Sequence, residues 1–148
     1  MNKILKKLLS TNEECSSFFL RLALGLMILP HGLQKTFGLF GGHGFTGTMS
    51  FFTETMHIPY LFALLAIIAE FAGGIGLILG LFTRVSALGV GVTMAVAAFH
   101  NSGNGWFMNW FGQQKGEGLE FFVLAVGIAI ALFIQGAGKL SIDRFLSK

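Results

Sequence analysis

The stretch "IPYLFALLAIIAEFAGGIGLILGLFTRVSAL", residues 58–88, decides the fold. Its first part is an apolar run long enough to cross the ~30 Å hydrocarbon core of a membrane, which takes roughly 20 helical residues. Pro59 opens the run, and proline suits the first turn of a helix. The letters "LFTRVS" leave room only for a tight turn before a new apolar run begins. The stretch therefore predicts two membrane-spanning helices joined by a tight turn, with Glu70 inside the first.

The composition of the whole chain predicts a membrane protein. Of its 148 residues, 53% are hydrophobic and 11% are charged, whereas a typical soluble domain is about 25% charged. Backbone groups in hydrocarbon must pair internally, so apolar stretches of this length predict helices. Four such stretches predict spans at about 16–37, 59–82, 83–102 and 119–136. We therefore expect an all-α fold, a membrane four-helix bundle that forms a single domain over residues 1–148.

The small net charge of +3 is distributed unevenly along the chain. With four spans, both termini lie on one side of the membrane, and that side collects seven cationic residues: Lys3, Lys6, Lys7, Arg84, Lys139, Arg144 and Lys148. The loops of the opposite side contain two, Lys35 and Lys115. Cationic loops favour the cytoplasmic side, so this bias predicts cytoplasmic termini. We interpret the charge as topology and expect no nucleic-acid partner.

The two longer loops, predicted to face outward, carry apolar side chains in a pattern. Phe45, Met49, Phe52 and Met56 recur at helical spacing, which predicts an amphipathic helix lying in the outer membrane interface. The second loop contains two tryptophans, which favour the level of the lipid head groups. Two interpretations remain open: the loops only cap the bundle, or they form a lid over a site.

Four ionisable residues fall inside the predicted spans at similar depth: His31, Glu70, His100 and Glu120. Counting ~1.5 Å per helical residue places all four toward the outer half of the membrane, with Lys35 and Glu117 just above them. A charge at the bilayer centre costs ~3 kcal/mol, so each residue needs a partner or a function. Since the four come from different helices, one inward residue per helix would form a polar layer.

This layer could carry chemistry in more than one way. A buried glutamate among histidines could relay protons, or it could hydrogen-bond a quinone head group, whose reduction needs protons. Histidines and carboxylates could also bind a metal, but the Glu-x-x-His pairs of di-iron bundles are absent from the sequence, and we expect no metal. We therefore assign the catalytic role to the four layer residues and expect quinone as the cofactor.

The expected contacts for such a cofactor are cations and aromatic residues near the layer: Arg21, Lys35, Trp106 and Trp110. The structural alternative is that Arg21 or Lys35 neutralises the carboxylates and that the network only fixes the register of the helices. We expect Arg21 and Glu70 to form a pair or a near pair, and Lys35 to anchor the outer end of the first span.

Small residues mark helix faces that can pack closely. On the first span, Gly25, Ile28, Gly32 and Lys35 fall within about 40° of Arg21 at ~100° per residue. Small residues recur every four positions on the second and third spans, as Ala72, Gly76 and Gly80 and as Ala87, Gly91 and Ala95. Such rows favour close packing of helices, either within the bundle or between two copies in a homo-oligomer.

Four segments together resemble the DoxX family of small bacterial four-span membrane proteins. They are "RLALGLMILPHGLQK" at 21–35, the stretch at 58–88, "GEGLEFF" at 116–122 and "GAGKLSID" at 136–143. The residues that match the family pattern are Arg21, Gly32, Lys35, Pro59, Glu70, Gly73, Gly74, Gly80, Gly136, Gly138, Ser141 and Asp143. The resemblance implies a bacterial inner membrane protein. It also implies relatives that include a subunit of a thiosulfate:quinone oxidoreductase and a membrane component linked to superoxide dismutase.

Three functions are compatible with these patterns. The first is a membrane subunit of an oxidoreductase system that handles quinone or protons at the polar layer, and it predicts an outward-facing lateral opening. The second is a scaffold that holds soluble redox or stress-defence enzymes at the membrane and has a closed, fully paired polar core. The third is a conduit for protons or small molecules. Cys15 is the only cysteine, so dithiol chemistry would need a redox protein partner. We prefer the first.

Overall fold

The computed structural model describes residues 3–11 and 14–147, and within these residues it is helical, with no strand. Its elements are α1 (Lys3–Leu9), α2 (Ser16–Phe37), η1 (Leu39–Gly41), α3 (Gly44–Ser50), η2 (Phe51–Thr55), α4 (Tyr60–Leu79), α5 (Thr83–Asn101), η3 (Ser102–Asn104), α6 (Leu119–Gln135) and α7 (Ile142–Ser147). The side chains of Lys3 and Lys6, and all of Lys148, lie outside the described part. The all-α prediction is confirmed.

Three of these helices, α2, α4 and α5, are long and apolar enough to cross a membrane, and α6 is apolar but shorter at 17 residues. The predicted bounds of the four spans agree with α2, α4, α5 and α6 to within three residues. The second span ends earlier than predicted because α4 stops at Gly80, which adopts a left-handed conformation with φ 66°. Glycine takes this conformation without strain and so ends helices.

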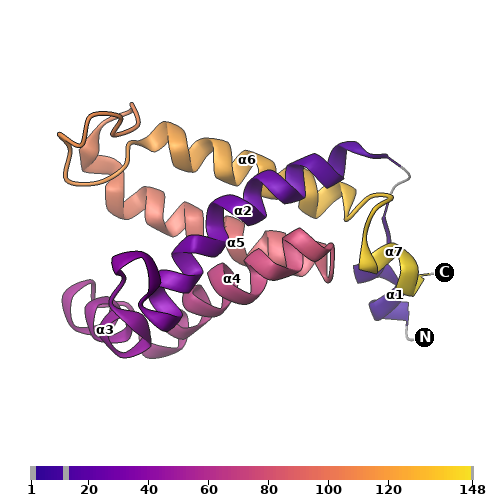
Figure 1. The fold of residues 1–148 in the computed structure, drawn as a ribbon, viewed down its shortest axis with the longest axis horizontal. Helices are drawn as coiled ribbons and strands as arrows, with labels where there is room; N and C mark the ends of the chain where they lie inside the picture. The colour runs from indigo at the N-terminus through magenta and orange to yellow at the C-terminus, as the bar shows by residue number, and fades with distance from the viewer. Residues whose placement is uncertain (1–2, 12–13, 148) are drawn as a thin grey trace.

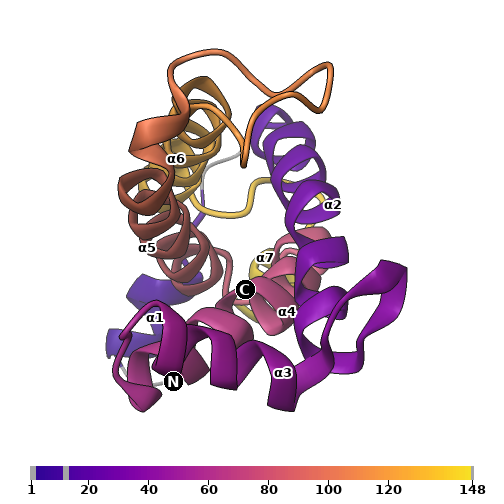
Figure 2. The same ribbon diagram turned by 90° about the vertical axis from the view of Figure 1, so that its left-hand side faces the viewer.

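The long helices form a four-helix bundle (Figure 1). α2 packs along α4, α4 along α5 and α5 along α6, while a smaller contact between α6 and α2 closes the ring. Both termini, with α1 and α7, gather at one end, which we call the terminal end. α3 and the α5–α6 loop, residues 102–118, lie at the opposite end, which we call the loop end (Figure 2).

The predicted inner face of the first span is confirmed. Arg21, Gly25, Ile28 and Gly32 are all buried along α2. A Cβ atom on Gly32 would lie 2.6 Å from the backbone of Phe71 on α4, so only glycine allows the two helices to approach this closely. This contact brings the C-terminal half of α2 directly against the middle of α4.

The predicted amphipathic helix also forms, across the loop end, but in two parts. α3 continues directly into η2, a π-helical turn. Met49 is buried, and it packs with Phe52 against Ala63 and Ile67 of α4. The apolar face therefore attaches this segment to the start of α4 and places η2 beside the cleft described below.

The pairing predicted for Arg21 and Glu70 is wrong. Arg21 is fully buried at the terminal end, and its guanidinium donates hydrogen bonds to backbone carbonyl oxygens: Leu77 at 2.9 Å, Ile78 at 3.1 Å, Ala137 at 2.9 Å and Leu140 at 2.5 Å. Two of these carbonyls end α4, where the helix dipole favours a cation. Arg21 cannot also reach Glu70, since Glu70 lies halfway along α4.

Asp143 completes the terminal end. Its carboxylate accepts hydrogen bonds from the backbone N–H groups of Phe82, at 2.7 Å, and Thr83, at 2.8 Å, which begin α5. Its own N–H donates to the Gly80 oxygen at 2.9 Å. The carboxylate therefore satisfies N–H groups that the helix leaves without an internal partner. Gly80 is tightly enclosed, because a Cβ there would lie 2.7 Å from the Arg21 guanidinium.

Candidate functional site

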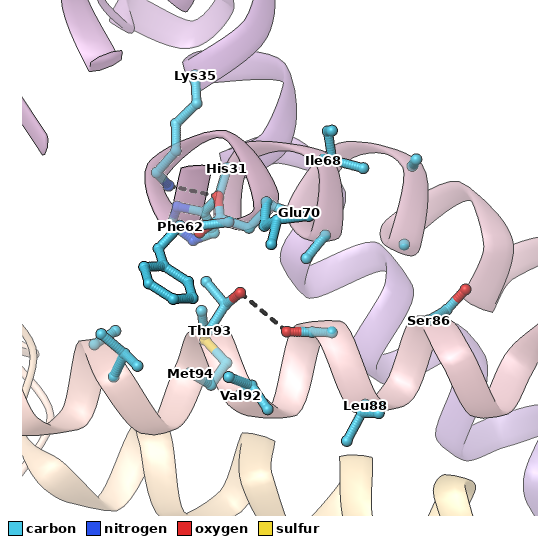
Figure 3. Close-up of a pocket in the computed structure, with 18 of the residues that line it drawn as sticks. His31, Lys35, Phe62, Ile68, Glu70, Ser86, Leu88, Val92, Thr93 and Met94 are labelled. Carbon is cyan, nitrogen blue, oxygen red and sulfur yellow. Dashed lines mark hydrogen bonds and ion pairs between the residues drawn. The ribbon is translucent and has the colours of Figure 1, made fainter. Parts of the chain in front are cut away.

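A cavity of about 1370 Å³ lies between α4 and α5, and we call it the α4–α5 cleft (Figure 3). Its lining runs from Phe62 to Leu79 on α4, across the α4–α5 turn, and from Val85 to Asn101 on α5. Most of the lining is apolar. Many of the lining side chains, Leu65, Ile68, Val92 and Val96 among them, are exposed on the outside of the bundle. The cleft therefore opens sideways, where a membrane protein meets lipid.

The polar centre of the cleft is an ion pair between α2 and α4. Lys35 Nζ lies 2.5 Å from Glu70 Oε2, and the side chains are 23% and 4% exposed. Figure 3 shows the lysine reaching down to the carboxylate beside His31. Removing one partner of a buried pair leaves an uncompensated charge, so Lys35 supplies the counter-charge for the buried Glu70 carboxylate. The close approach at Gly32 places both side chains within reach of each other.

Other ionisable groups extend from this pair toward the loop end. His31 lines the cleft, and its imidazole is within electrostatic range of Lys35, Glu70 and Glu117. His100, at the end of α5, and Glu117, in the α5–α6 loop, line the same cavity. Three of the four predicted layer residues, His31, Glu70 and His100, are therefore brought to one cleft.

The fourth layer residue lies apart from the cleft lining. Glu120 Oε1 accepts a hydrogen bond from the backbone N–H of Met108 at 2.6 Å, and the Glu120 N–H donates to the Trp106 oxygen at 2.9 Å. Glu120 therefore holds the α5–α6 loop onto the start of α6. The sequence predicted a similar depth for Glu120 and Glu70, but the Glu120 side chain does not line the cavity that contains Glu70.

The predicted cofactor contacts are divided in the same way. Lys35 lines the cleft, whereas Arg21 lies at the terminal end. Trp106 and Trp110 belong to the α5–α6 loop, outside the cleft lining, with side chains 53% and 76% exposed. Glu117, which the sequence placed just above the polar layer without assigning it a role, also lines the cleft. The sequence feature that could have indicated a role for Glu117 is its position in "GEGLEFF", just before the start of α6.

No group of three or more His, Cys, Asp or Glu side chains among the described residues is placed to hold a metal ion. The cleft instead combines one ion pair, two exposed imidazoles and long apolar walls. Such a site can bind an amphiphile whose polar head exchanges hydrogen bonds with Lys35, Glu70 and His31.

A family model described as DoxX matches residues 16–103. The chain belongs to the DoxX family. The match covers α2 to α5, and so it includes the cleft walls and both partners of the Lys35–Glu70 pair. In this DoxX protein, the C-terminal segment that carries Asp143 lies beyond the residues matched by the family model. It is nevertheless hydrogen-bonded to the α4–α5 turn, which lies within the matched residues.

Two curated relatives support the assignment. An uncharacterized protein of Haemophilus influenzae is 33% identical over 144 residues, which cover 88% of this DoxX chain and 90% of the relative. The inner membrane protein YqjF of Escherichia coli is 31% identical over 111 residues, covering 71% and 76% of the two chains. No solved structure matches the DoxX chain. These findings establish a DoxX-family membrane protein, one of whose relatives is an inner membrane protein.

Proposed function

We propose that this DoxX protein is a membrane subunit of an oxidoreductase system and binds a quinone at the loop end of the α4–α5 cleft. The observation that supports the proposal is the Lys35–Glu70 pair, partly open at the head of a long apolar cleft. Small-molecule sites are mostly apolar, with a few placed polar groups, and have volumes of about 300–1,000 Å³. The cleft has that character and room for a chain as well as a head group.

The side chains suit both forms of such a ligand. The Lys35 ammonium is a donor only, so it can hydrogen-bond a quinone carbonyl oxygen, and the ionised Glu70 is an acceptor, so it can bind a quinol hydroxyl. His31 can do either. The apolar walls of α4 and α5 would hold the isoprenoid chain, since burying apolar surface is favourable. A bound quinone would supply the two-electron chemistry, and these residues would orient it and handle its protons.

Electrons would come from a redox protein partner, because Cys15 is the only cysteine and cannot form a dithiol pair within the chain. We also propose that both termini are cytoplasmic, because cationic residues concentrate at the terminal end. The cleft's polar end then lies in the outer half of the inner membrane.

The scaffold alternative has one observation in its favour: the buried charges of Glu70 and Arg21 each have a partner within the bundle. A scaffold has no need for a lateral cleft that leads to a buried ion pair, so the cleft favours quinone binding. A continuous conduit is disfavoured, because the terminal half of the bundle is filled by buried Leu24, Ile28 and Leu77.

The test is direct binding of quinone to the purified protein. Quinone that copurifies with the wild-type chain is measured by mass spectrometry, and a soluble short-chain quinone is titrated by quenching of intrinsic tryptophan fluorescence. We expect Glu70→Gln to weaken binding by about tenfold, the equivalent of one charge-assisted hydrogen bond. Glu54→Gln changes an exposed carboxylate of η2 and should leave binding unchanged. Equal affinity in a folded Glu70→Gln variant would contradict the proposal.

A further inference from the structure

We infer that Glu70 exchanges its proton with the loop side of the membrane alone, by way of His31 and Glu117, and that the terminal half of the bundle is closed to protons. The inference deepens the proposed function because it concerns the same site. It specifies from which side the site takes up and releases protons. It does not require a quinone to be present.

The first support is the order of ionisable groups in the cleft. From the buried carboxylate of Glu70, the next titratable groups are Lys35 and His31 of α2, and beyond them His100 of α5 and Glu117 of the α5–α6 loop. η2 and the neighbouring Met56 contribute only apolar side chains to the lining. Lys35 is partly exposed, and His31 and Glu117 are exposed. Titratable groups therefore lead from Glu70 to the loop surface.

The second support is the filling of the opposite half. Ile28, Leu77 and Leu132 are fully buried in the core between the middle of the bundle and the terminal end. The cleft itself continues to the α4–α5 turn, but beyond Glu70 in that direction no titratable side chain of the described residues lines it. The hydroxyls of Ser86 and Thr93, which also line the cleft, each donate to a backbone carbonyl. Among the described residues, neither hydroxyl is hydrogen-bonded to Glu70.

The third support is the charge at the terminal end. Arg21 is fully buried with three guanidinium nitrogens bonded to carbonyl oxygens. Such a fixed cation cannot release a proton, and its buried charge repels protons and other cations that approach the terminal end. Asp143 is close by, but both of its carboxylate oxygens are occupied by N–H groups of α5. The terminal end is therefore sealed by charge as well as by packing.

The experiment measures protonation of Glu70 in sealed proteoliposomes of the full chain. Dicyclohexylcarbodiimide labels carboxyl groups in apolar sites only when they are protonated, and mass spectrometry of the peptide that contains Glu70 quantifies the label. The exposed Cys15, at the terminal end, reports the orientation through an impermeant maleimide. The pH is then varied on one side while the other side is held constant.

We expect labelling of Glu70 to increase severalfold when the loop-side pH is lowered. Lowering the pH on the terminal side should leave labelling unchanged. Labelling that follows the terminal-side pH, that follows both sides equally, or that is absent at every pH would overturn the inference. Wild-type protein suffices for this comparison, so it does not depend on whether a Glu70 variant folds.

Two variants locate the route. His31→Phe should slow the loop-side response severalfold, and Glu54→Gln, an exposed carboxylate outside the cleft lining, should not. The quinone titration is a separate measurement. Sided labelling without quinone binding would reject the proposed function alone, and quinone binding with unsided labelling would reject this inference alone.

Discussion

At the scale of single residues, each buried charge has a partner of a different kind. Arg21 binds the carbonyl groups at the end of α4, and Asp143 binds the N–H groups at the start of α5. Both therefore complement a helix dipole and hold the terminal end together. Lys35 and Glu70 instead bind each other, at the head of the cleft. The pair differs from the contacts at the terminal end because the Lys35 side chain remains partly exposed.

The Lys35–Glu70 pair gives a prediction about stability. Lys35→Met leaves the Glu70 carboxylate buried without a partner and should destabilise the fold by about 3–5 kcal/mol. The double variant Lys35→Met with Glu70→Leu removes both charges and should recover most of that loss. Thermal unfolding in detergent micelles measures both. If Lys35→Met alone were as stable as the wild type, the pair would not hold the charge of Glu70.

At the scale of elements, the contact between α2 and α4 positions the site. Gly32 allows the backbone of α2 to lie against Glu70 and Phe71, so Lys35, one turn later, extends over the carboxylate. The two glycines that follow Glu70 on α4, Gly73 and Gly74, leave no open space at their Cβ positions. Gly73 faces α5 at Val90, and Gly74 faces α2 at Leu29. They bring neighbouring helices close.

A matched pair of glycine substitutions tests this packing. Gly32→Ala places a methyl group against rigid backbone and should cost about 1–3 kcal/mol. Gly127→Ala on α6 places the same group where nothing lies within 4 Å, and should stabilise the helix by about 0.5–1 kcal/mol. Unfolding midpoints of the two variants in the same detergent make the comparison. Similar shifts for both would mean that the close contact between α2 and α4 does not form.

At the scale of the whole molecule, the two ends of the bundle differ in construction. The terminal end is closed by hydrogen bonds from Arg21 and Asp143 that join α2, α4, α5 and the chain after α6. At the loop end the ionisable side chains lie along an open cleft. We therefore expect the protein to span the membrane in one orientation, with the cationic terminal end on the cytoplasmic side.

Cysteine labelling in spheroplasts checks this orientation. Cys15 is exposed near the terminal end and should react with an impermeant maleimide only after the membrane is broken. Gly103 lies in open space at the loop end, so Gly103→Cys in a Cys15→Ser background should react in intact spheroplasts. The opposite pattern would place the termini outside.

The sequence alone predicted most of the architecture. Apolar runs of span length and the tight turn in "LFTRVS" predicted the long helices, because helix formation in hydrocarbon depends on local composition. The inner face of α2 followed from the helical repeat of Gly25, Ile28 and Gly32. Residue counts predicted a similar depth for His31, Glu70 and His100, and in the structure these three side chains line one cleft.

Only the tertiary structure decided which charges meet. The sequence does not indicate the partners of Arg21, Lys35, Glu70 and Glu120. A partner depends on the direction in which each helix face points and on backbone groups from distant segments. Arg21 donates hydrogen bonds to carbonyl groups of α4 and of the chain after α6, and Glu120 accepts a hydrogen bond from an N–H group of the α5–α6 loop. Lys35 is therefore the cation that forms an ion pair with Glu70. The helices were therefore determined locally, whereas the polar centre was determined by how closely glycine allowed α2 to approach α4.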